Sequence, residues 1–369
     1  MNRISVLHCI HWPKSGITSL LKYMIPLFDQ SKIITHVILF EDDDEAISEF
    51  SEICSSVHTL SFSQSRIKGL SKYLSLLHSL NPLILHTHSF QPGLWGRLFV
   101  TKARTKHVCT LHSVYPYFSS PDYRSRLKRK LEAFSLKHSD ATIICVSEAV
   151  RRSVSSVYQF ARPQVIENGI PVDIFSQRQQ PLSKTTEGKT FISLGRLHYE
   201  KGFDILLYAF ARVLEVERDV KLYLVGEGEE RAKLEKIVVG LGISDHVFFT
   251  GFQCEPFQYF DRADIYISSS RYEGFPLSIA EAMLWGLPVI STQVGGVTTM
   301  LYHGVTGWLV PPENPEALSA AMLFLLRNKE VRDGIGERGK RFIVKNADIK
   351  KTARLYEQLY RSLINLQRN

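Results

Sequence analysis

Paired cysteines and long apolar runs are both missing from this sequence of 369 residues. The five cysteines stand alone, with no Cys-x-x-Cys spacing (Cys9, Cys54, Cys109, Cys145 and Cys254). This excludes a disulfide framework or a zinc ribbon, and dispersed thiols favour a reducing compartment. No stretch of about 18 apolar residues occurs, which excludes a transmembrane helix. The opening segment, MNRISVLHCIHWP, predicts a first β-strand in place of a secretory signal, so we expect a cytoplasmic protein.

Acidic residues are scarce between positions 53 and 137, where only 2 Asp and Glu accompany 13 Lys and Arg. The net charge of +8 lies almost wholly in residues 1–170, which hold 20 basic and 13 acidic side chains, against 25 and 24 in the rest. The densest part, Tyr123–Asp140, sets a basic face against a partial helical stripe of apolar residues (Leu127, Leu131, Phe134 and Leu136).

A basic face of this kind suits plain solvation, nucleic acid or an anionic membrane. Because the sequence contains no nucleic-acid-binding motif, we expect an anionic membrane surface as the partner of the first domain, and no nucleic acid. The protein would then attach peripherally to the inner face of the cell membrane.

Short apolar runs alternate with longer amphipathic stretches from Ile4 to Glu167, and again from Thr190 to Asn328. This alternation is typical of parallel sheets flanked by helices. The polar segment 176–189 has no apolar periodicity and predicts a linker. We therefore expect an α/β protein with domains at 1–175 and 190–345, followed by a helix at 346–369 that packs back on the first domain. Two facing domains of this kind would share a cleft at the carboxyl ends of their strands.

The segment RYEGFPLSIAEAMLWG, residues 271–286, holds the strongest candidate site. Pro276 suits the first position of a helix, and Leu277 to Trp285 can form that helix. Glu273 would then lie in a loop at the helix mouth and Glu281 inside the helix. Free N–H groups at a helix N-terminus bind phosphate, and carboxylates accept hydrogen bonds from sugar hydroxyls. The pattern favours a nucleotide-sugar, although glutamates are also common near helix starts.

Two cations, Arg196 and Lys201, follow a predicted strand in the segment SLGRLHYEKGF and suit a diphosphate, although loop cations are usually only solvated. Three histidines, His86, His88 and His112, lie at the ends of two other predicted strands. No carboxylate or cysteine is spaced to complete a metal site with them, so we expect no metal. His112 is better placed as a polar group in the cleft.

Taken in order, these segments resemble the retaining GT-B glycosyltransferases of family 4, and the similarity spans nearly the whole chain. It is carried by Gly16, VSEAV, VIENGIPVDIF, GRLHYEKGFDILLYAF, VGEGEER, FTGF, EGFPLSIAEAM, PVISTQVGG and GVTGWLVPPENPEAL. One departure is Ser15, which stands where many members carry a second glycine. The resemblance implies two Rossmann-like domains facing a cleft. It also implies sugar transfer from a nucleotide-diphosphate sugar to a glycan or lipid-linked acceptor, with retention, in surface polysaccharide, lipopolysaccharide or capsule biosynthesis.

The resemblance assigns roles to individual residues. Arg196 and Lys201 would neutralise the donor diphosphate, Glu281 would hold the ribose hydroxyls, and Glu273 the transferred sugar. His112 would lie near the reacting carbon and the acceptor. Further donor contacts would come from Gly16, from Phe252 beside the base, and from the backbone of Gly274, Phe275, Pro276 and Leu277. We expect UDP in preference to GDP, and neither a cofactor nor a metal, because two cations already face the diphosphate.

Two other functions stay open. A nucleotide-sugar epimerase on a related fold would need no acceptor, and a polysaccharide-assembly scaffold would have no turnover. The joint presence of both cations and both glutamates argues against the scaffold. The sequence offers no convincing nucleophile, so the expected mechanism is leaving-group stabilisation with the acceptor attacking the same face of the sugar.

Overall fold

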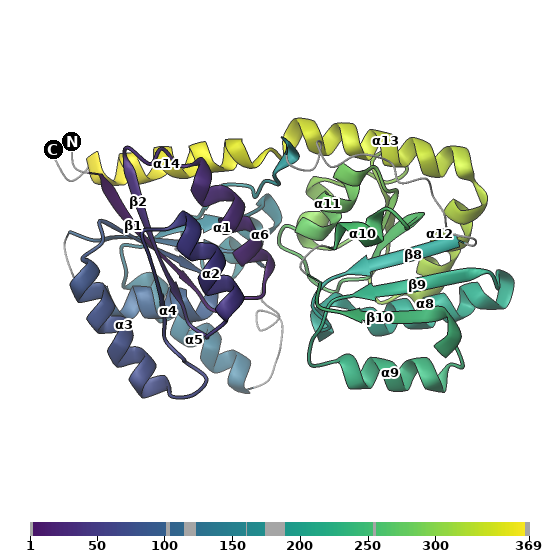
Figure 1. Ribbon diagram of the computed structural model, residues 1–369, viewed down its shortest axis with the longest axis horizontal. Coiled ribbons are helices and arrows are strands. Elements are labelled where there is room, and N and C mark those ends of the chain that lie inside the picture. The colour runs from purple at the N-terminus through teal and green to yellow at the C-terminus, as the bar shows by residue number, and fades with distance from the viewer. Residues whose placement is uncertain are drawn as a thin grey trace. The chain divides into compact units, whose positions relative to one another are not determined.

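The computed structural model describes residues 3–100, 104–113, 123–159, 161–173, 189–253 and 256–365. They form two compact units, one of Met1–Ile170 with Ile349–Asn369, and one of Pro171–Asp348 (Figure 1). The second unit therefore begins before the boundary at 175 that we expected, and the chain returns to the first unit at its end. The expected linker, 176–189, lies outside the described residues except for Lys189, which begins a strand.

The first unit is built on a parallel sheet of seven strands in the order β3-β2-β1-β4-β5-β6-β7. Its strands are β1 Ile4–Ile10, β2 Ile33–Leu39, β3 Ser56–Thr59, β4 Ile84–His88, β5 Lys106–Leu111, β6 Thr142–Cys145 and β7 Gln164–Val165. Its helices are α1 Gly16–Met24, η1 Ile25–Leu27, α2 Asp44–Ile53, α3 Arg66–Leu80, α4 Phe90–Phe99, α5 Tyr123–Lys137, α6 Glu148–Val157 and α14 Ile349–Asn365. The strand order reverses between β1 and β4, and sheets of this kind bind ligands at the carboxyl end of such a reversal.

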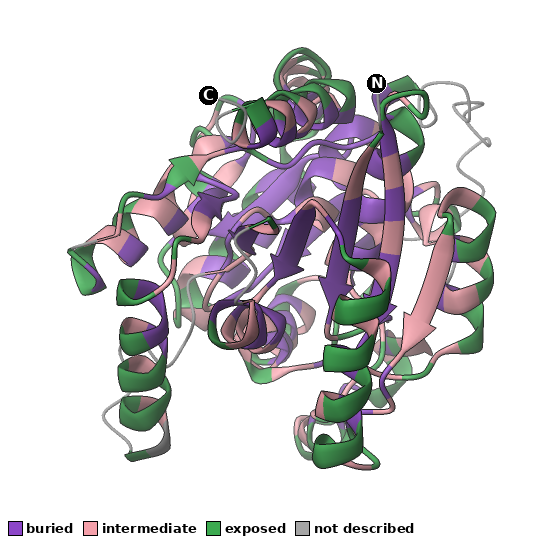
Figure 2. Ribbon diagram, turned by 90° about the vertical axis from the view of Figure 1, so that its left-hand side faces the viewer, coloured by how far each residue is buried: buried purple, intermediate pink, exposed green. Residues whose placement is uncertain are grey.

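Helices on both faces bury the central strands of this unit. Figure 2 shows these strands as buried, with the exposed surfaces of the helices turned outward. An aromatic cluster of Phe40, Phe62, Tyr73 and Trp95 fills one side of the sheet. Burial on both faces explains why apolar residues predominate in β1 and β2, where each strand has five apolar residues of seven and the carboxyl-terminal halves are continuously buried.

Helix α14 covers the same sheet, although it follows the second unit in sequence. Its buried residues recur at helical spacing (Ile349, Thr352, Ala353, Tyr356, Tyr360 and Ile364). It packs near α1 and η1, and the Ile349 N–H donates to the Ile170 carbonyl at 3.0 Å. The first unit thus contains both ends of the chain.

The second unit has a parallel sheet of six strands in the order β10-β9-β8-β11-β12-β13. Its strands are β8 Lys189–Leu194, β9 Val220–Val225, β10 Val247–Gly251, β11 Ile265–Ser268, β12 Val289–Thr292 and β13 Trp308–Val310. Its helices are η3 Tyr199–Lys201, α8 Phe203–Val216, α9 Arg231–Gly240, η4 Ser244–His246, α10 Phe257–Phe260, α11 Leu277–Trp285, η5 Gly295–Thr299, α12 Pro315–Arg327 and α13 Lys329–Asn346. Here the order reverses between β8 and β11.

These two sheets confirm the prediction of an α/β protein with two Rossmann-like domains. Helix α11 has the predicted bounds, but Pro276 is the residue before the helix (φ −77°, ψ 95°) and not its first position. In the part of the chain that the structure describes, no helix combines the length and apolar character needed to cross a bilayer.

Candidate functional site

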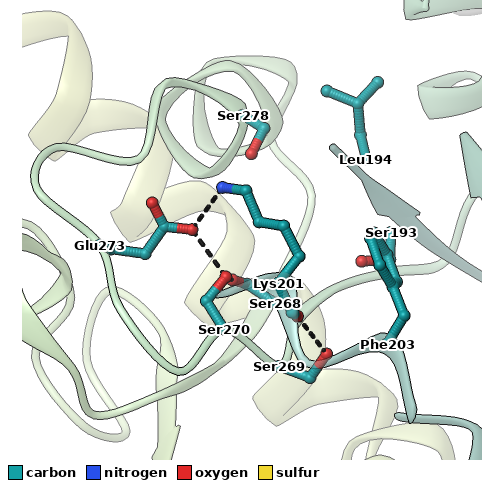
Figure 3. A pocket seen from close by; sticks show the side chains of 9 residues that line it. All are labelled: Ser193, Leu194, Lys201, Phe203, Ser268, Ser269, Ser270, Glu273 and Ser278. Carbon is teal, nitrogen blue, oxygen red and sulfur yellow. Dashed lines mark hydrogen bonds and ion pairs between the residues drawn. The ribbon is translucent and has the colours of Figure 1, made fainter. Parts of the chain in front are cut away.

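Lys201 and Glu273 meet at the carboxyl edge of the second sheet. Lys201 Nζ donates to Glu273 Oε1 at 2.6 Å, and Ser270 Oγ donates to the same oxygen at 2.6 Å (Figure 3). The two residues line a small pocket with the last residues of β8 and β11, namely Ser193, Leu194 and Ser268, and with Phe203, Ser269, Ser270 and Ser278. The pocket therefore lies at the reversal of strand order, where the fold is expected to bind a ligand.

Two glycines bring the backbones around this pair into close contact. Gly202 follows Lys201 with φ +62°, and a Cβ there would lie 2.2 Å from the Ser269 carbonyl oxygen. Gly295 has φ +43°, and a Cβ there would lie 1.9 Å from the carbonyl oxygen of Glu273. Gly296 N–H donates to that same carbonyl at 3.0 Å. The glycine pair after β12 thus positions Glu273.

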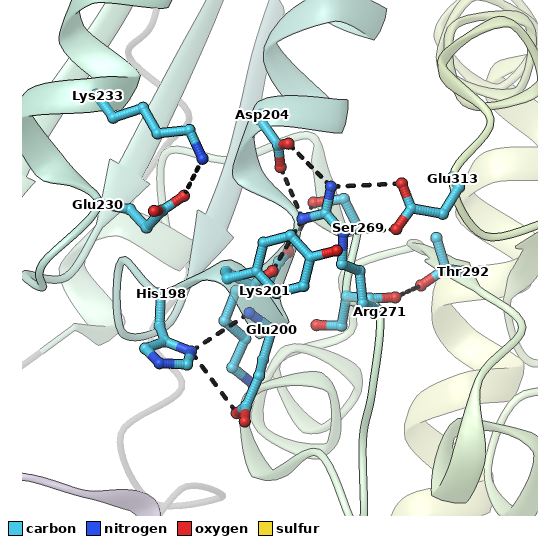
Figure 4. A network of polar contacts seen from close by, with 12 residues as sticks. His198, Glu200, Lys201, Asp204, Glu230, Lys233, Ser269, Arg271, Thr292 and Glu313 are labelled. Atoms are coloured by element: carbon cyan, nitrogen blue, oxygen red, sulfur yellow. Dashed lines mark hydrogen bonds and ion pairs between the residues drawn. The ribbon is translucent and has the colours of Figure 1, made fainter. Parts of the chain in front are cut away.

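Arg271 ties three segments around the pocket together, and sequence reasoning missed it. Its guanidinium donates to both carboxylate oxygens of Asp204 at 2.9 Å, to Glu313 at 2.5 Å, and to the Tyr199 carbonyl at 2.8 Å (Figure 4). The group also lies 4.1 Å from the centre of the Tyr199 ring. A bidentate, nearly buried arginine fixes geometry well, so Arg271 holds the turn that carries Lys201.

Arg196 and Glu281 are available for a ligand. Arg196 is exposed, and its side chain makes no hydrogen bond or ion pair with any described residue. Glu281 is half-buried in α11 and is likewise unpaired within the described ranges. Burial raises the pKa of Glu281 to about 8, because desolvation disfavours the charged form and no cation of the described residues compensates it.

Glu281 should make the folded state less stable as pH rises. Its folded pKa of about 8 lies above the ordinary value of 4.5, so between these values the folded chain holds a proton that the unfolded chain has lost. The free energy of unfolding is therefore unaffected by this group below pH 4.5. Between pH 4.5 and about 8 it falls by at most about 1.4 kcal/mol per pH unit. Urea unfolding of Glu281→Gln, compared with the wild type at both ends of the window, should remove this slope. An identical pH slope in both proteins would contradict the assignment.

The remaining predicted donor contacts lie on loops and helix starts. Gly274, Phe275 and Pro276 lead into α11, and the backbone N–H groups of Leu277 and Ser278 donate to no carbonyl among the described residues. Phe252 follows β10 with 48% of its surface exposed. In the first unit, Gly16 opens α1, and Ser15 caps that helix by accepting a hydrogen bond from the Thr18 N–H. Serine thus has a structural reason to stand before Gly16.

His112 follows β5 and is half-buried in the first unit. Its Nε2 lies 3.0 Å from Nδ1 of His88, and burial lowers its pKa to about 3, so it is neutral at physiological pH. Among the described residues, one group of three histidines could offer nitrogens to a metal: His8, His86 and His88, with ligand atoms within 4.8 Å of one another. This group omits His112 and includes His8, which the sequence did not single out. Both nitrogens of His86 already contact protein hydroxyls.

Comparison with known proteins identifies the family. Residues 14–174 match the family described as Glycosyltransferase Family 4, and residues 174–342 match Glycosyl transferases group 1. The chain belongs to these glycosyltransferases. The matches confirm the resemblance drawn from the sequence motifs and show that the protein is an enzyme of this class.

The glycosyltransferase resembles several characterised proteins at low identity. It is 27% identical to N-acetyl-alpha-D-glucosaminyl L-malate synthase of Bacillus anthracis, over 81% of this chain and 80% of the relative. It is 29% identical to alpha-monoglucosyldiacylglycerol synthase of Streptococcus pneumoniae, over 69% of this chain and 63% of the relative. HepE of Anabaena, solved in complex with UDP-glucose, has a TM-score of 0.82 at 21% identity, covering 98% of this chain and 100% of that chain. This structural likeness shows that the fold is GT-B.

Proposed function

We propose that this glycosyltransferase moves a sugar from a UDP-sugar to a glycan or lipid-linked acceptor, with retention, in cell-surface polysaccharide or glycolipid synthesis. The observation that carries the proposal is the 2.6 Å contact between Lys201 and Glu273 at the reversal of strand order. A carboxylate suits sugar hydroxyls, and the ammonium has two further N–H donors for a phosphate. The UDP-glucose bound to HepE supports the choice of uridine.

Leaving-group stabilisation supplies the chemistry in this proposal. Arg196 and Lys201 take up the charge that develops on the diphosphate, together with the free N–H groups at the start of α11. Glu281 accepts hydrogen bonds from the ribose. These groups neutralise the leaving group without a metal ion.

In this proposal the anomeric configuration is retained because the acceptor attacks the same face of the sugar from which the diphosphate leaves. Double displacement commonly uses two carboxyl groups about 5 Å apart. Glu273 is the only carboxylate among the residues that line the described pocket. A second carboxylate for a covalent intermediate is therefore not available from that pocket.

Helix α5 supports a membrane-bound acceptor, because its apolar side faces outward. Tyr123, Leu127, Leu131 and Phe134 lie on one side of the helix and are 78%, 46%, 43% and 58% exposed. Glu132 is instead fully buried, 3.5 Å from the Arg97 guanidinium, and accepts a hydrogen bond from the Tyr158 hydroxyl at 3.1 Å.

An ordinary surface helix turns its apolar side chains inward. On α5 only Leu136 of the predicted apolar stripe is buried, whereas the other three stripe residues face outward beside exposed basic residues. At about 100° per residue, Arg126 and Lys130 flank the exposed apolar stripe on one side and Lys128 on the other. Apolar side chains bordered by cations suit the interface of an anionic bilayer. We therefore propose that the glycosyltransferase acts peripherally, at the membrane that holds its acceptor.

A donor panel tests the proposed reaction. Calorimetry with UDP, UDP-glucose, UDP-N-acetylglucosamine and GDP-mannose measures the base and sugar preference, and labelled donor with a lipid extract measures transfer. Transfer that requires the extract supports the proposal. Sugar epimerisation without any acceptor would overturn it in favour of an epimerase.

His112→Ala should lower turnover while leaving UDP affinity nearly unchanged. His112 belongs to the first unit, whereas the proposed diphosphate contacts belong to the second. Loss of one oriented hydrogen-bond donor in an active site commonly costs about a hundred- to a thousandfold in turnover. Steady-state kinetics and UDP calorimetry on the same variant check this. Equal losses of both quantities would point to a folding role for His112.

A further inference from the structure

Three histidines of the first unit form a continuous chain of ring contacts that the sequence did not reveal. His8 on β1 is the register partner of His86 on β4, and His88 lies two residues further along β4. His8 Nδ1 lies 3.1 Å from His88 Nε2, and His88 Nδ1 lies 3.0 Å from His112 Nε2. The chain runs from the buried interior of the sheet to its carboxyl edge, at the reversal of strand order.

The chemistry of neutral imidazole couples the two contacts. Burial lowers the pKa of His8 and His112 to about 3, and that of His88 well below its usual range. A neutral ring has one N–H and one lone pair, so a ring that uses both nitrogens donates at one and accepts at the other. If His88 accepts a hydrogen bond from His8, it must donate one to His112, and if it donates to His8, it must accept from His112.

The inner end of the chain selects the direction. Nε2 of His8 is buried and has no hydrogen-bond partner among the described residues. In protein interiors an orphaned N–H is rarer than an unused acceptor, so this nitrogen carries the lone pair. His8 then donates from Nδ1 to His88, and His88 donates from Nδ1 to Nε2 of His112. The hydrogen of His112 must therefore be on Nδ1, which contacts no other described residue.

The neighbouring polar groups do not compete with the hydrogen bonds that join His8, His88 and His112. His86 forms a separate chain, with Nδ1 at 2.6 Å from the Tyr360 hydroxyl and Nε2 at 2.7 Å from the Thr110 hydroxyl. Directly after His88, the backbone of Ser89 adopts φ 70° and ψ −173°, a conformation that residues other than glycine rarely take. Such strain is found at sites where a backbone must hold a functional group in place.

We infer that His88 is a positioning residue that fixes His112 as the Nδ1–H tautomer, so that His112 acts as a neutral hydrogen-bond donor to a ligand hydroxyl oxygen and not as a general base. The role of His112 toward a ligand rests on the proposed function, whereas the tautomer does not. The hydroxyl belongs either to the transferred sugar or to the acceptor.

Nitrogen-15 NMR of the full chain with labelled histidine tests the tautomer without any activity assay. His112→Gln assigns the His112 signals, and the wild type should show a protonated Nδ1 and an unprotonated Nε2 at this ring. In His88→Leu, both His112 signals should move toward the averaged positions of a tautomer mixture. His107→Gln is the matched control, because His107 is also buried and contacts the Thr87 hydroxyl instead. An Nε2–H form in the wild type, or His112 signals that ignore the loss of His88, would overturn the inference.

Kinetics provides the second test. His112→Asn places an amide N–H near the position of Nδ1 and should retain more turnover than His112→Gln, which places it near Nε2. His88→Leu should lower kcat roughly two- to tenfold, as expected for one lost hydrogen bond, with the donor KM unchanged. Equal activity of the Asn and Gln variants would contradict a donor role at Nδ1.

Donor hydrolysis without acceptor separates the two sources of the hydroxyl. Hydrolysis that falls in His112→Gln assigns the oxygen to the donor sugar, and hydrolysis that persists while transfer falls assigns it to the acceptor. If the wild type turns over no donor at all, the proposed function fails, while the NMR result still decides the tautomer.

Discussion

Lys201→Ala and Glu281→Ala should each weaken UDP-sugar binding about ten- to a hundredfold. Lys201→Ala loses charge-assisted hydrogen bonds worth roughly 1.5–3 kcal/mol. Glu281→Ala loses the hydrogen bonds of a largely neutral carboxyl group, at about 1 kcal/mol each, and about 1.4 kcal/mol corresponds to a factor of ten. Lys201 should affect UDP and the UDP-sugar alike, because its proposed partner is the diphosphate. Calorimetry with both ligands measures the two affinities on one sample.

A matched control separates this effect from general loss of charge. Lys329 also pairs with a carboxylate, Asp333, on the exposed side of α13, so Lys329→Ala should leave UDP affinity unchanged. Glu273→Gln should keep UDP affinity, because Lys201 remains, and should lose the extra affinity contributed by the sugar. Unchanged donor binding in both Lys201→Ala and Glu281→Ala would refute the site.

Reversing Arg126, Lys128, Arg129 and Lys130 of α5 to glutamate should abolish binding to anionic vesicles. Arg126, Lys128 and Lys130 border the exposed apolar stripe and each contribute on the order of 1 kcal/mol near such a surface, so their loss alone costs about a hundredfold in partitioning. Co-sedimentation of the wild type should require anionic lipid and weaken at high ionic strength. UDP affinity of the variant should stay at the wild-type value.

A second quadruple variant carries the same change in net charge elsewhere. Arg327, Lys329, Arg341 and Lys345 are exposed on α12 and α13, and reversing them should leave vesicle binding intact. Replacing Leu127, Leu131 and Phe134 with serine should weaken the part of the binding that survives high salt. Vesicle binding that ignores lipid charge, or survives reversal on α5, would leave this helix as a solvated surface.

Local signals in the sequence were enough to predict the fold and the position of the best motif. The strand–helix alternation gave both parallel sheets, and proline followed by an apolar run gave the bounds of α11. The short strand β3, Ser56–Thr59, was missed because four half-buried residues carry no clear apolar pattern. Turn and helix signals act over a few residues, so they are visible without knowledge of the fold.

Contacts between distant segments could not be predicted in the same way. Arg271 reaches Asp204 across 67 positions and Glu313 across 42, and neither spacing has a meaning in the sequence. His8 meets His88 across 80 positions, only because β1 and β4 are neighbours in the sheet. The inward turn of Glu132 was equally invisible, since a lone glutamate among basic residues predicts a solvated side chain.

The return of α14 to the first unit has a consequence for synthesis of the protein on the ribosome. Tyr356 and Tyr360 bury their hydroxyls against Thr110 and His86, so the amino-terminal sheet lacks part of its cover until the last helix emerges. Domains generally fold in the order of their synthesis. Here the second unit is continuous in sequence, so all of its residues are synthesised before the last helix of the first unit. The nascent chain therefore carries an unfinished amino-terminal unit through most of its translation. A ribosome that stops before α14 releases a finished second unit joined to an uncovered first one.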